Sequence, residues 1–135
     1  MVWRRRQMIR VYYRYGYGGG STQTTANNNT STEIGTGLAN SNAIIAQTGH
    51  TESAAKVCRD YNGGGKTDWF LPSKDELAAL YLQKDIVGGF SPNDNSYWSS
   101  SEYTSPRALY QTFTTGSQGA IDKNNTSRVR AVRAF

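Results

Sequence analysis

Residues 68–81, "DWFLPSKDELAALY", carry the clearest structural signal in the chain. The apolar run 69–71 is typical of a short buried strand, and Pro72 ends it because proline has no backbone N–H. Ser73 and Glu76 form a capping-box pattern, in which the side chain of each residue bonds the backbone N–H of the other. Helical spacing then places on one face Leu77, Leu80 and Tyr81. This stretch predicts a buried extended segment that leads directly into an amphipathic helix.

The sequence before this stretch predicts a strand, a polar loop and a first helix. Residues 8–17 are rich in β-formers, and residues 18–37 are a low-complexity polar run. Ser41 or Asn42 is placed to cap a helix that contains two isoleucines. After a Thr-Gly break, the apolar face resumes at 54–58.

The sequence after residue 88 predicts strands and turns. Residues 97–102 and 108–115 are expected as strands, with a hairpin around 116–119 and a last strand in 129–135. Two helices followed by a β-rich half indicate an α+β domain. Large apolar side chains are available for one core, namely Trp69, Phe70, Leu71, Leu77, Leu80, Trp98, Phe113, Val129 and Val132.

The net charge of +5 comes from one end of the chain. Five arginines lie within the first fourteen residues, and the remainder holds ten basic and ten acidic residues. The basic terminus is interpreted as a solvated tail or a strand with a charged outer face; a nucleic-acid or membrane-surface arm is the alternative. On the first interpretation, we expect no nucleic-acid partner. We also expect no membrane insertion, because no apolar run approaches membrane-spanning length, and no secretory signal is visible.

The chain is poor in residues for metal or nucleophilic chemistry. Cys58 and His50 are the only cysteine and histidine, which excludes an intrachain disulfide, a cysteine metal cluster and sites built on paired histidines. Asp68 and Glu102 are acids without a nearby nucleophile pattern. We therefore expect a non-enzymatic protein with no cofactor and no metal.

Several ordered motifs carry a family resemblance. They are "IGTG" (34–37), "NAIIAQTG" (42–49), "DWFLPSKDELAALY", "GGFS" (88–91), "YWSSSE" (97–102), "YQTF" (110–113) and "VRAVRAF" (129–135). Over about residues 33–135 the chain resembles the Lcl C-terminal domain family, which has the C-type lectin-like fold. The resemblance implies two helices, a twisted antiparallel sheet and an irregular C-terminal binding face. Residues 1–32 are expected to form an N-terminal strand and polar loop of the same domain.

Two activities known in this fold lack their motifs here. Calcium-dependent sugar binding uses a Glu or Gln before a proline, whereas "SPNDNSYW" places Ser91 before Pro92, with Asn93 and Asp94 interpreted as turn formers. Formylglycine-generating relatives work through cysteines, and the single Cys58 is interpreted as a small buried hydrophobe.

Residues 104–128 mix polar, aromatic and arginine side chains without periodicity. The fold also resembles that of the variable proteins of diversity-generating retroelements, in which adenine-targeted mutagenesis rewrites a C-terminal segment. Rewritten Asn codons never yield Lys, Glu, Gln, Met or Trp, and in this segment only Gln111, Gln118 and Lys123 are of those types. The alternative is that Thr and Ser suit exposed strands, while Asn and Gly suit turns.

A ligand-binding surface of this composition resembles an antibody paratope. The candidate ligand-binding residues are Thr104, Ser105, Arg107, Tyr110, Thr112, Thr114, Ser117, Asp122, Asn124, Asn125 and Ser127.

The expected function is recognition of a protein or glycan on a target cell, at a bacterial surface, outside the cell or on a phage particle. One alternative is an invariant adhesin or structural domain for sulfated or cell-wall polysaccharide, using Arg107, Arg128, Arg130 and Arg133. An enzyme built on Glu102 or Asp68 is the remaining alternative.

Overall fold

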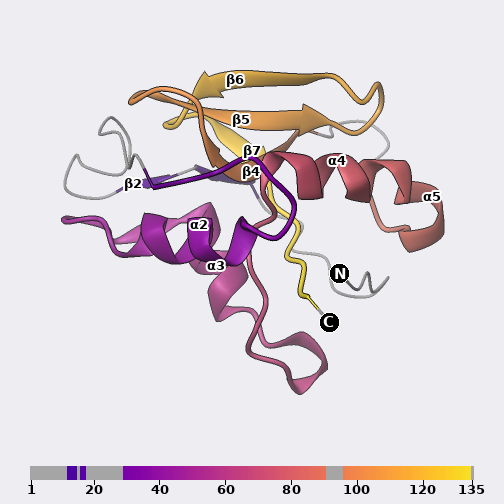
Figure 1. Ribbon diagram of the computed structural model, residues 1–135, viewed down its shortest axis with the longest axis horizontal. Helices are drawn as coiled ribbons and strands as arrows, with labels where there is room; N and C mark the ends of the chain where they lie inside the picture. The colour runs from indigo at the N-terminus through magenta and orange to yellow at the C-terminus, as the bar shows by residue number, and fades with distance from the viewer. Residues whose placement is uncertain (1–11, 15, 18–28, 91–95, 135) are drawn as a thin grey trace.

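The computed structural model describes residues 12–14, 16–17, 29–90 and 96–134, and it is a mixed α+β structure (Figure 1). Its helices are α2 (Gly37–Ile45), α3 (Ala54–Asp60), α4 (Lys74–Leu82) and α5 (Lys84–Val87). Its strands are β1 (Tyr12–Arg14), β2 (Gly16–Tyr17), β3 (Glu52–Ser53), β4 (Ser96–Glu102), β5 (Arg107–Thr112), β6 (Gln118–Asp122) and β7 (Thr126–Arg128). The described part thus contains four α-helices and the short 3₁₀ helix η1 (Gly63–Gly65), where two helices were predicted.

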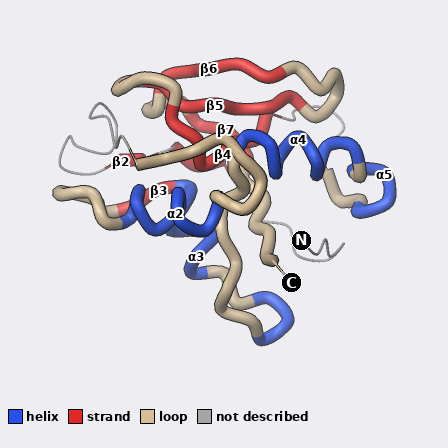
Figure 2. Tube along the Cα trace, in the orientation of Figure 1, coloured by secondary structure: helices blue, strands red, loops and turns tan. Residues whose placement is uncertain are grey.

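The larger sheet is mixed rather than purely antiparallel as predicted. Its strand order is β1-β7-β4-β5-β6, and within it β7 pairs with β4 in parallel while its other pairings are antiparallel. A second, two-stranded sheet pairs β2 with β3. Going inward from the rim of the molecule, Figure 2 shows β6, β5 and then β4, with α2 and α3 beyond. Among the described strands, β6 therefore forms one edge of the larger sheet.

The helix predicted around residues 41–45 begins earlier than expected. Thr36 is the N-cap residue of α2, so the predicted cap at Ser41 or Asn42 is wrong. Ser41 is buried inside the helix, where its hydroxyl donates to the Gly37 carbonyl at 2.8 Å. The Ser41 hydroxyl also accepts the Leu71 backbone N–H at 3.1 Å, so this serine joins α2 to the buried segment instead of starting a helix.

The capping box at the start of α4 is confirmed. The Ser73 hydroxyl accepts the Glu76 N–H at 3.3 Å, and the Glu76 carboxylate accepts the Ser73 N–H at 2.8 Å. Glu76 is only 1% exposed, and its second oxygen accepts the Gly35 N–H at 3.1 Å. The glutamate therefore holds the segment before α2 as well as the start of α4.

Every residue predicted for the core is buried, but the core is divided in two. Adjacent residues of β4 point to opposite faces, so Trp98 enters one core and Tyr97 the other. The first core contains Ile44, Ala54, Ala55, Cys58, Trp69, Leu71, Trp98, Ala108, Val129 and Ala131. The second core contains Phe70, Leu77, Leu80, Val87, Tyr97, Phe113 and Val132. The run 69–71 alternates between them.

The last strand lies earlier than the sequence predicted. Residues 126–128 form β7, whereas residues 129–131 belong to no strand and Val132 forms an isolated antiparallel bridge with Phe70. The Phe70 N–H donates to the Val132 carbonyl at 2.8 Å, and the reverse bond is 3.0 Å. The C-terminal residues thus pair with the buried segment 69–71, and like that segment they contribute side chains to both cores.

Replacement of Gly37 by alanine tests the close contact between α2 and the buried segment. An added Cβ would lie 2.8 Å from Phe70 Cε2 and 2.9 Å from the Leu71 carbonyl oxygen, and would also meet the Glu76 carboxylate. We expect Gly37→Ala to lower the free energy of unfolding by about 1–3 kcal/mol through overpacking, despite alanine's better helix propensity. Urea denaturation measures this, with exposed Asn42→Ala in the same helix as the control. Equal stability of the two variants would contradict the packing described here.

Candidate functional site

The exposed turns of the C-terminal part lie at two ends of the β5–β6 hairpin. The two strands are antiparallel, with Arg107 opposite Asp122 and Gln111 opposite Gln118. The Lys123 N–H donates to the Pro106 carbonyl at 2.8 Å, which places the 103–106 loop beside the 123–125 turn. We call the end of the hairpin that carries the 103–106 loop and the 123–125 turn the loop end. The 113–117 turn is at the other end.

Six of the predicted ligand-binding residues gather at the loop end, and all six are exposed. They are Thr104, Ser105, Arg107, Asp122, Asn124 and Asn125. The Arg107 Nε lies 3.2 Å from Asp122 Oδ1, an exposed ion pair that joins the two strands. The loop end is therefore a continuous polar surface.

The other five predicted residues do not join this surface. Thr114 and Ser117 are exposed at the 113–117 turn. This turn is separated from the loop end by the length of β5, roughly 17 Å at about 3.3 Å per strand residue. Tyr110 and Thr112 are half-buried. Each is an odd number of positions from Arg107 along β5, so their side chains lie on the face of the sheet opposite to that of Arg107. Tyr110 packs against the first core.

Ser127 is 3% exposed, so its prediction as an exposed contact residue is wrong. It lies in β7, a strand between β1 and β4 within the sheet, and not in an exposed turn.

A buried ion pair anchors the loop end. Lys123 is fully buried, and its Nζ lies 2.6 Å from Glu102 Oε2, whose side chain is 8% exposed. The Glu102 N–H donates to the Thr30 hydroxyl at 3.0 Å. This pair ties the end of β4 to the turn after β6, so the exposed residues on both sides stand on a fixed backbone.

Three consecutive buried serines of β4, residues 99–101, bond the backbone of the segments beside the loop end. The register of β4 on β5 shifts between Trp98 and Glu102, and the serines fill this irregularity. The Ser99 hydroxyl donates to the Leu109 carbonyl at 2.8 Å, and the Ser101 hydroxyl accepts the Lys74 N–H at 3.0 Å. The "SSS" motif therefore connects β5 and the start of α4.

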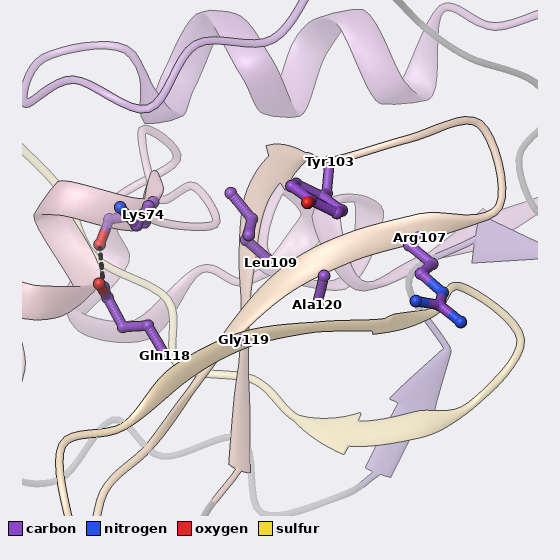
Figure 3. A pocket seen from close by; sticks show the side chains of 7 residues that line it. All are labelled: Lys74, Tyr103, Arg107, Leu109, Gln118, Gly119 and Ala120. Carbon is purple, nitrogen blue, oxygen red and sulfur yellow. Dashed lines mark hydrogen bonds between the residues drawn. The ribbon is translucent and has the colours of Figure 1, made fainter.

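An open pocket of about 530 Å³ lies over the β5–β6 hairpin (Figure 3). Its lining consists of Lys74, Tyr103, Arg107, Leu109, Gln118, Gly119 and Ala120. Leu109 lies directly opposite Ala120 in the sheet register, so these two residues form an apolar floor. Tyr103 is 62% exposed. The pocket thus combines an apolar floor, an aromatic ring and two cationic side chains.

Of the lining residues, only Arg107 was among the predicted ligand-binding residues. Leu109, Gly119 and Ala120 lie inside the predicted segment 104–128, although they are not among the eleven candidate ligand-binding residues. Lys74 comes from the start of α4, and the Gln118 amide donates to its carbonyl at 3.5 Å. No local pattern predicts that contact, because it joins residues 44 positions apart.

The two acids considered for catalysis occupy separate ion pairs. Glu102 binds Lys123, whereas Asp68 accepts two bonds from Arg133 at 2.7 and 3.0 Å. The bond from the Arg133 guanidinium holds the pKa of Asp68 below its usual value.

The titratable residues that remain give no sign of a metal site. Within the described ranges, no group of three or more His, Cys, Asp or Glu side chains is arranged to hold a metal ion. Burial raises the pKa of the Cys58 thiol, in keeping with a structural role in the first core. His50 Nε2 lies 2.8 Å from the hydroxyl of Ser53, the α3 cap, and burial lowers the pKa of this imidazole. Pro92, Asn93 and Asp94 lie outside the described residues.

Two of the four arginines considered for polyanion binding are buried. Arg130 packs its guanidinium 4.7 Å from the centre of the Phe90 ring, and burial lowers its pKa. Arg133 is 9% exposed and bonded to Asp68. Arg128 is half-buried, which leaves Arg107 as the exposed member of the set.

The sequence profile of the Lcl C-terminal domain matches residues 1–133. The chain belongs to the Lcl C-terminal domain family. The match extends through residues 1–32, beyond the resemblance seen over residues 33–135. No curated protein matches this Lcl domain. Among the helices that the structure describes, none is long and apolar enough to cross a membrane.

Breaking the buried ion pair tests how firmly the Lcl domain holds its loop end. Glu102→Gln removes the carboxylate from buried Lys123, and we expect a loss of about 3–5 kcal/mol in the free energy of unfolding. The matched control is Asp122→Asn, which breaks the exposed pair with Arg107 and costs less than about 1 kcal/mol. Urea denaturation of both variants measures the difference. Similar losses in the two would contradict an anchoring role for the buried pair.

Proposed function

We propose that this Lcl domain is a non-enzymatic recognition module with a C-type lectin-like architecture. Its target is a protein or glycan on the surface of another cell. The observation that carries this proposal is the open pocket at the β5–β6 hairpin, which lies beside the six exposed residues of the loop end. We further propose that the domain acts outside the cell, at a cell surface or on a phage particle.

The chemistry of the pocket suits recognition. Tyr103 and Arg107 are of the residue types enriched where binding energy concentrates, and the Leu109–Ala120 floor offers apolar contact area. The buried Lys123–Glu102 pair and the capped start of α4 hold the backbone around them. A pre-formed site of this kind loses little conformational entropy on binding.

We also propose that the exposed part of residues 104–128 is diversified. Three residues of the segment are of types that adenine-targeted rewriting cannot produce. Gln111 and Lys123 are buried framework residues, whereas Gln118 is exposed and lines the pocket. Exposed positions tolerate substitution within about 0.5 kcal/mol, whereas buried ones do not. The diversified set therefore excludes Ser127 and the buried Ala108.

The alternative is an invariant adhesin or structural domain for sulfated or cell-wall polysaccharide. Arg107 and Lys74 at the pocket favour an anionic ligand. Burial of Arg130 and Arg133 removes half of the arginines on which this alternative first rested. Binding dominated by charge would weaken steeply between low and high salt.

Direct binding tests the recognition surface. The purified domain is applied to a glycan array and to a panel of bacterial cells, and the strongest binder is titrated against variants. Arg107→Ala and Tyr103→Ala should each weaken binding by about tenfold or more, because truncated hot-spot residues carry such losses. Lys66→Ala, an exposed cation in the remote 63–67 loop, is the control and should bind as wild type. Unchanged affinity in both pocket variants would overturn this location of the site.

The coding DNA tests diversification separately. We expect a nearby template repeat that matches the codons of residues 104–128 and differs from them only at template adenines. Sequencing of the flanking region provides the measurement. Absence of any such repeat removes the diversification proposal and leaves the binding proposal unaffected.

A further inference from the structure

The outer strand of the sheet presents, at a known register, backbone groups that no other described strand bonds. β6 is at one edge of the five-stranded sheet, and Figure 1 shows it at the rim of the molecule with no described segment beyond it. The Thr112 N–H donates to the Ser117 carbonyl at 2.8 Å, so this pair and every second pair along the hairpin exchange hydrogen bonds. Gly119 and Ile121 therefore bond to β5. Gln118 and Ala120 direct their N–H and C=O groups outward.

A second contact supports the same assignment. The Leu109 carbonyl accepts the Ser99 hydroxyl from β4, so the backbone groups of Leu109 face β4 and not β6. Its partner across the hairpin is Ala120, which accordingly turns its own N–H and C=O to the free edge.

The pocket opens beside this edge because β6 carries small residues there. Gly119 and Ala120 form the part of the lining that belongs to the middle of the strand. A side chain from a neighbouring chain can pass over them onto Leu109, whereas large residues in β6 would close this route. Figure 3 shows Ala120 and Gly119 between the flanking Gln118 and Arg107.

The charge around the pocket favours an acidic partner. Lys74 and Arg107 line it, and none of its lining residues is an acid. Asp122 pairs with Arg107 at the loop end, which leaves Lys74 as the pocket cation that forms no ion pair with another described residue. A carboxylate near Gln118 would therefore meet a complementary charge.

We propose that β6 receives an extended peptide segment of a protein target as an added strand, with an Asp or Glu side chain placed in the pocket. This inference rests on the proposed recognition function and names the class of its target. Outward N–H and C=O groups at alternate residues match the spacing of another strand, and such main-chain bonds supply affinity while pockets supply specificity. The hydroxyl pattern of a glycan has no such two-residue repeat, so the edge favours a peptide.

A peptide library tests the proposal. Phage displaying random seven-residue peptides are selected on the immobilised domain, and the enriched peptides are synthesised and titrated. We expect alternating β-formers with one acidic residue. Ala120→Pro removes the outward N–H at a position where an edge strand tolerates proline, and should weaken peptide binding by about tenfold. Ala120→Gly keeps that N–H and removes only the methyl group from the pocket floor, so it should bind the peptide more tightly than Ala120→Pro.

The charge arm uses a matched pair of lysines. Lys74→Gln should weaken binding of the acidic peptide and leave its uncharged analogue unaffected, whereas Lys66→Gln in the remote loop should change neither. If Ala120→Pro does not fold, amide exchange of wild type decides. The Gln118 and Ala120 N–H groups should become protected when the peptide binds, and unchanged exchange there would overturn strand addition.

The failures of the two proposals are distinguishable. A glycan that binds with dependence on Lys74 and Arg107 but equally well to Ala120→Pro supports the recognition site and overturns the added strand. If neither a peptide nor a glycan nor a cell surface is bound, both proposals are overturned.

Discussion

The structure depends on the two-sided burial of residues 69–73. Their alternation sends Trp69 and Leu71 into the first core and Phe70 into the second, so one extended segment closes both. Backbone bonds join Phe70 to Val132 in both directions, and the Pro72 carbonyl accepts the Ser100 N–H at 2.7 Å. Because buried backbone groups must find partners, this segment determines where the C-terminal residues and β4 lie.

Buried polar groups extend this constraint to the surface. Glu76 joins the start of α4 to the segment before α2, and the serines of β4 join α4 to β5. At the loop end the Lys123–Glu102 pair has a similar role. Breaking a buried polar network of this kind costs stability, because a buried group that loses its protein partner has no water molecule to replace it. A complete network fixes one arrangement of the segments that it joins. They make the backbone beneath the pocket hard to displace.

A backbone fixed in this way allows the exposed side chains attached to it to be replaced. Side chains at the loop end point to solvent, where substitution costs little, while a change in either core costs several kcal/mol (about 2–5 for large-to-small replacements). The division between constrained and free positions follows burial more closely than position in the chain. Ser127 and Thr126 are neighbours in β7, yet the first is buried and the second exposed. A recognition domain can use this alternation to vary its contacts without losing its fold.

Local signals in the sequence were sufficient for the capping box at Ser73 and Glu76, the core residues and the α+β class, since each depends on neighbours within a few positions. They also predicted the β5–β6 hairpin, but its turn is at 113–117 and not at 116–119. The start of α2, the parallel pairing of β7 and the division of the core were decided only by tertiary structure. The start of α2 depends on Gly37 meeting Phe70 and Leu71, more than thirty positions away. The pocket has the same origin: Lys74 reaches β6 only because α4 packs against the sheet, and its partner Gln118 lies 44 positions on. Spacing along a chain reports local geometry, whereas a surface assembled from distant segments exists only once the cores have brought them together.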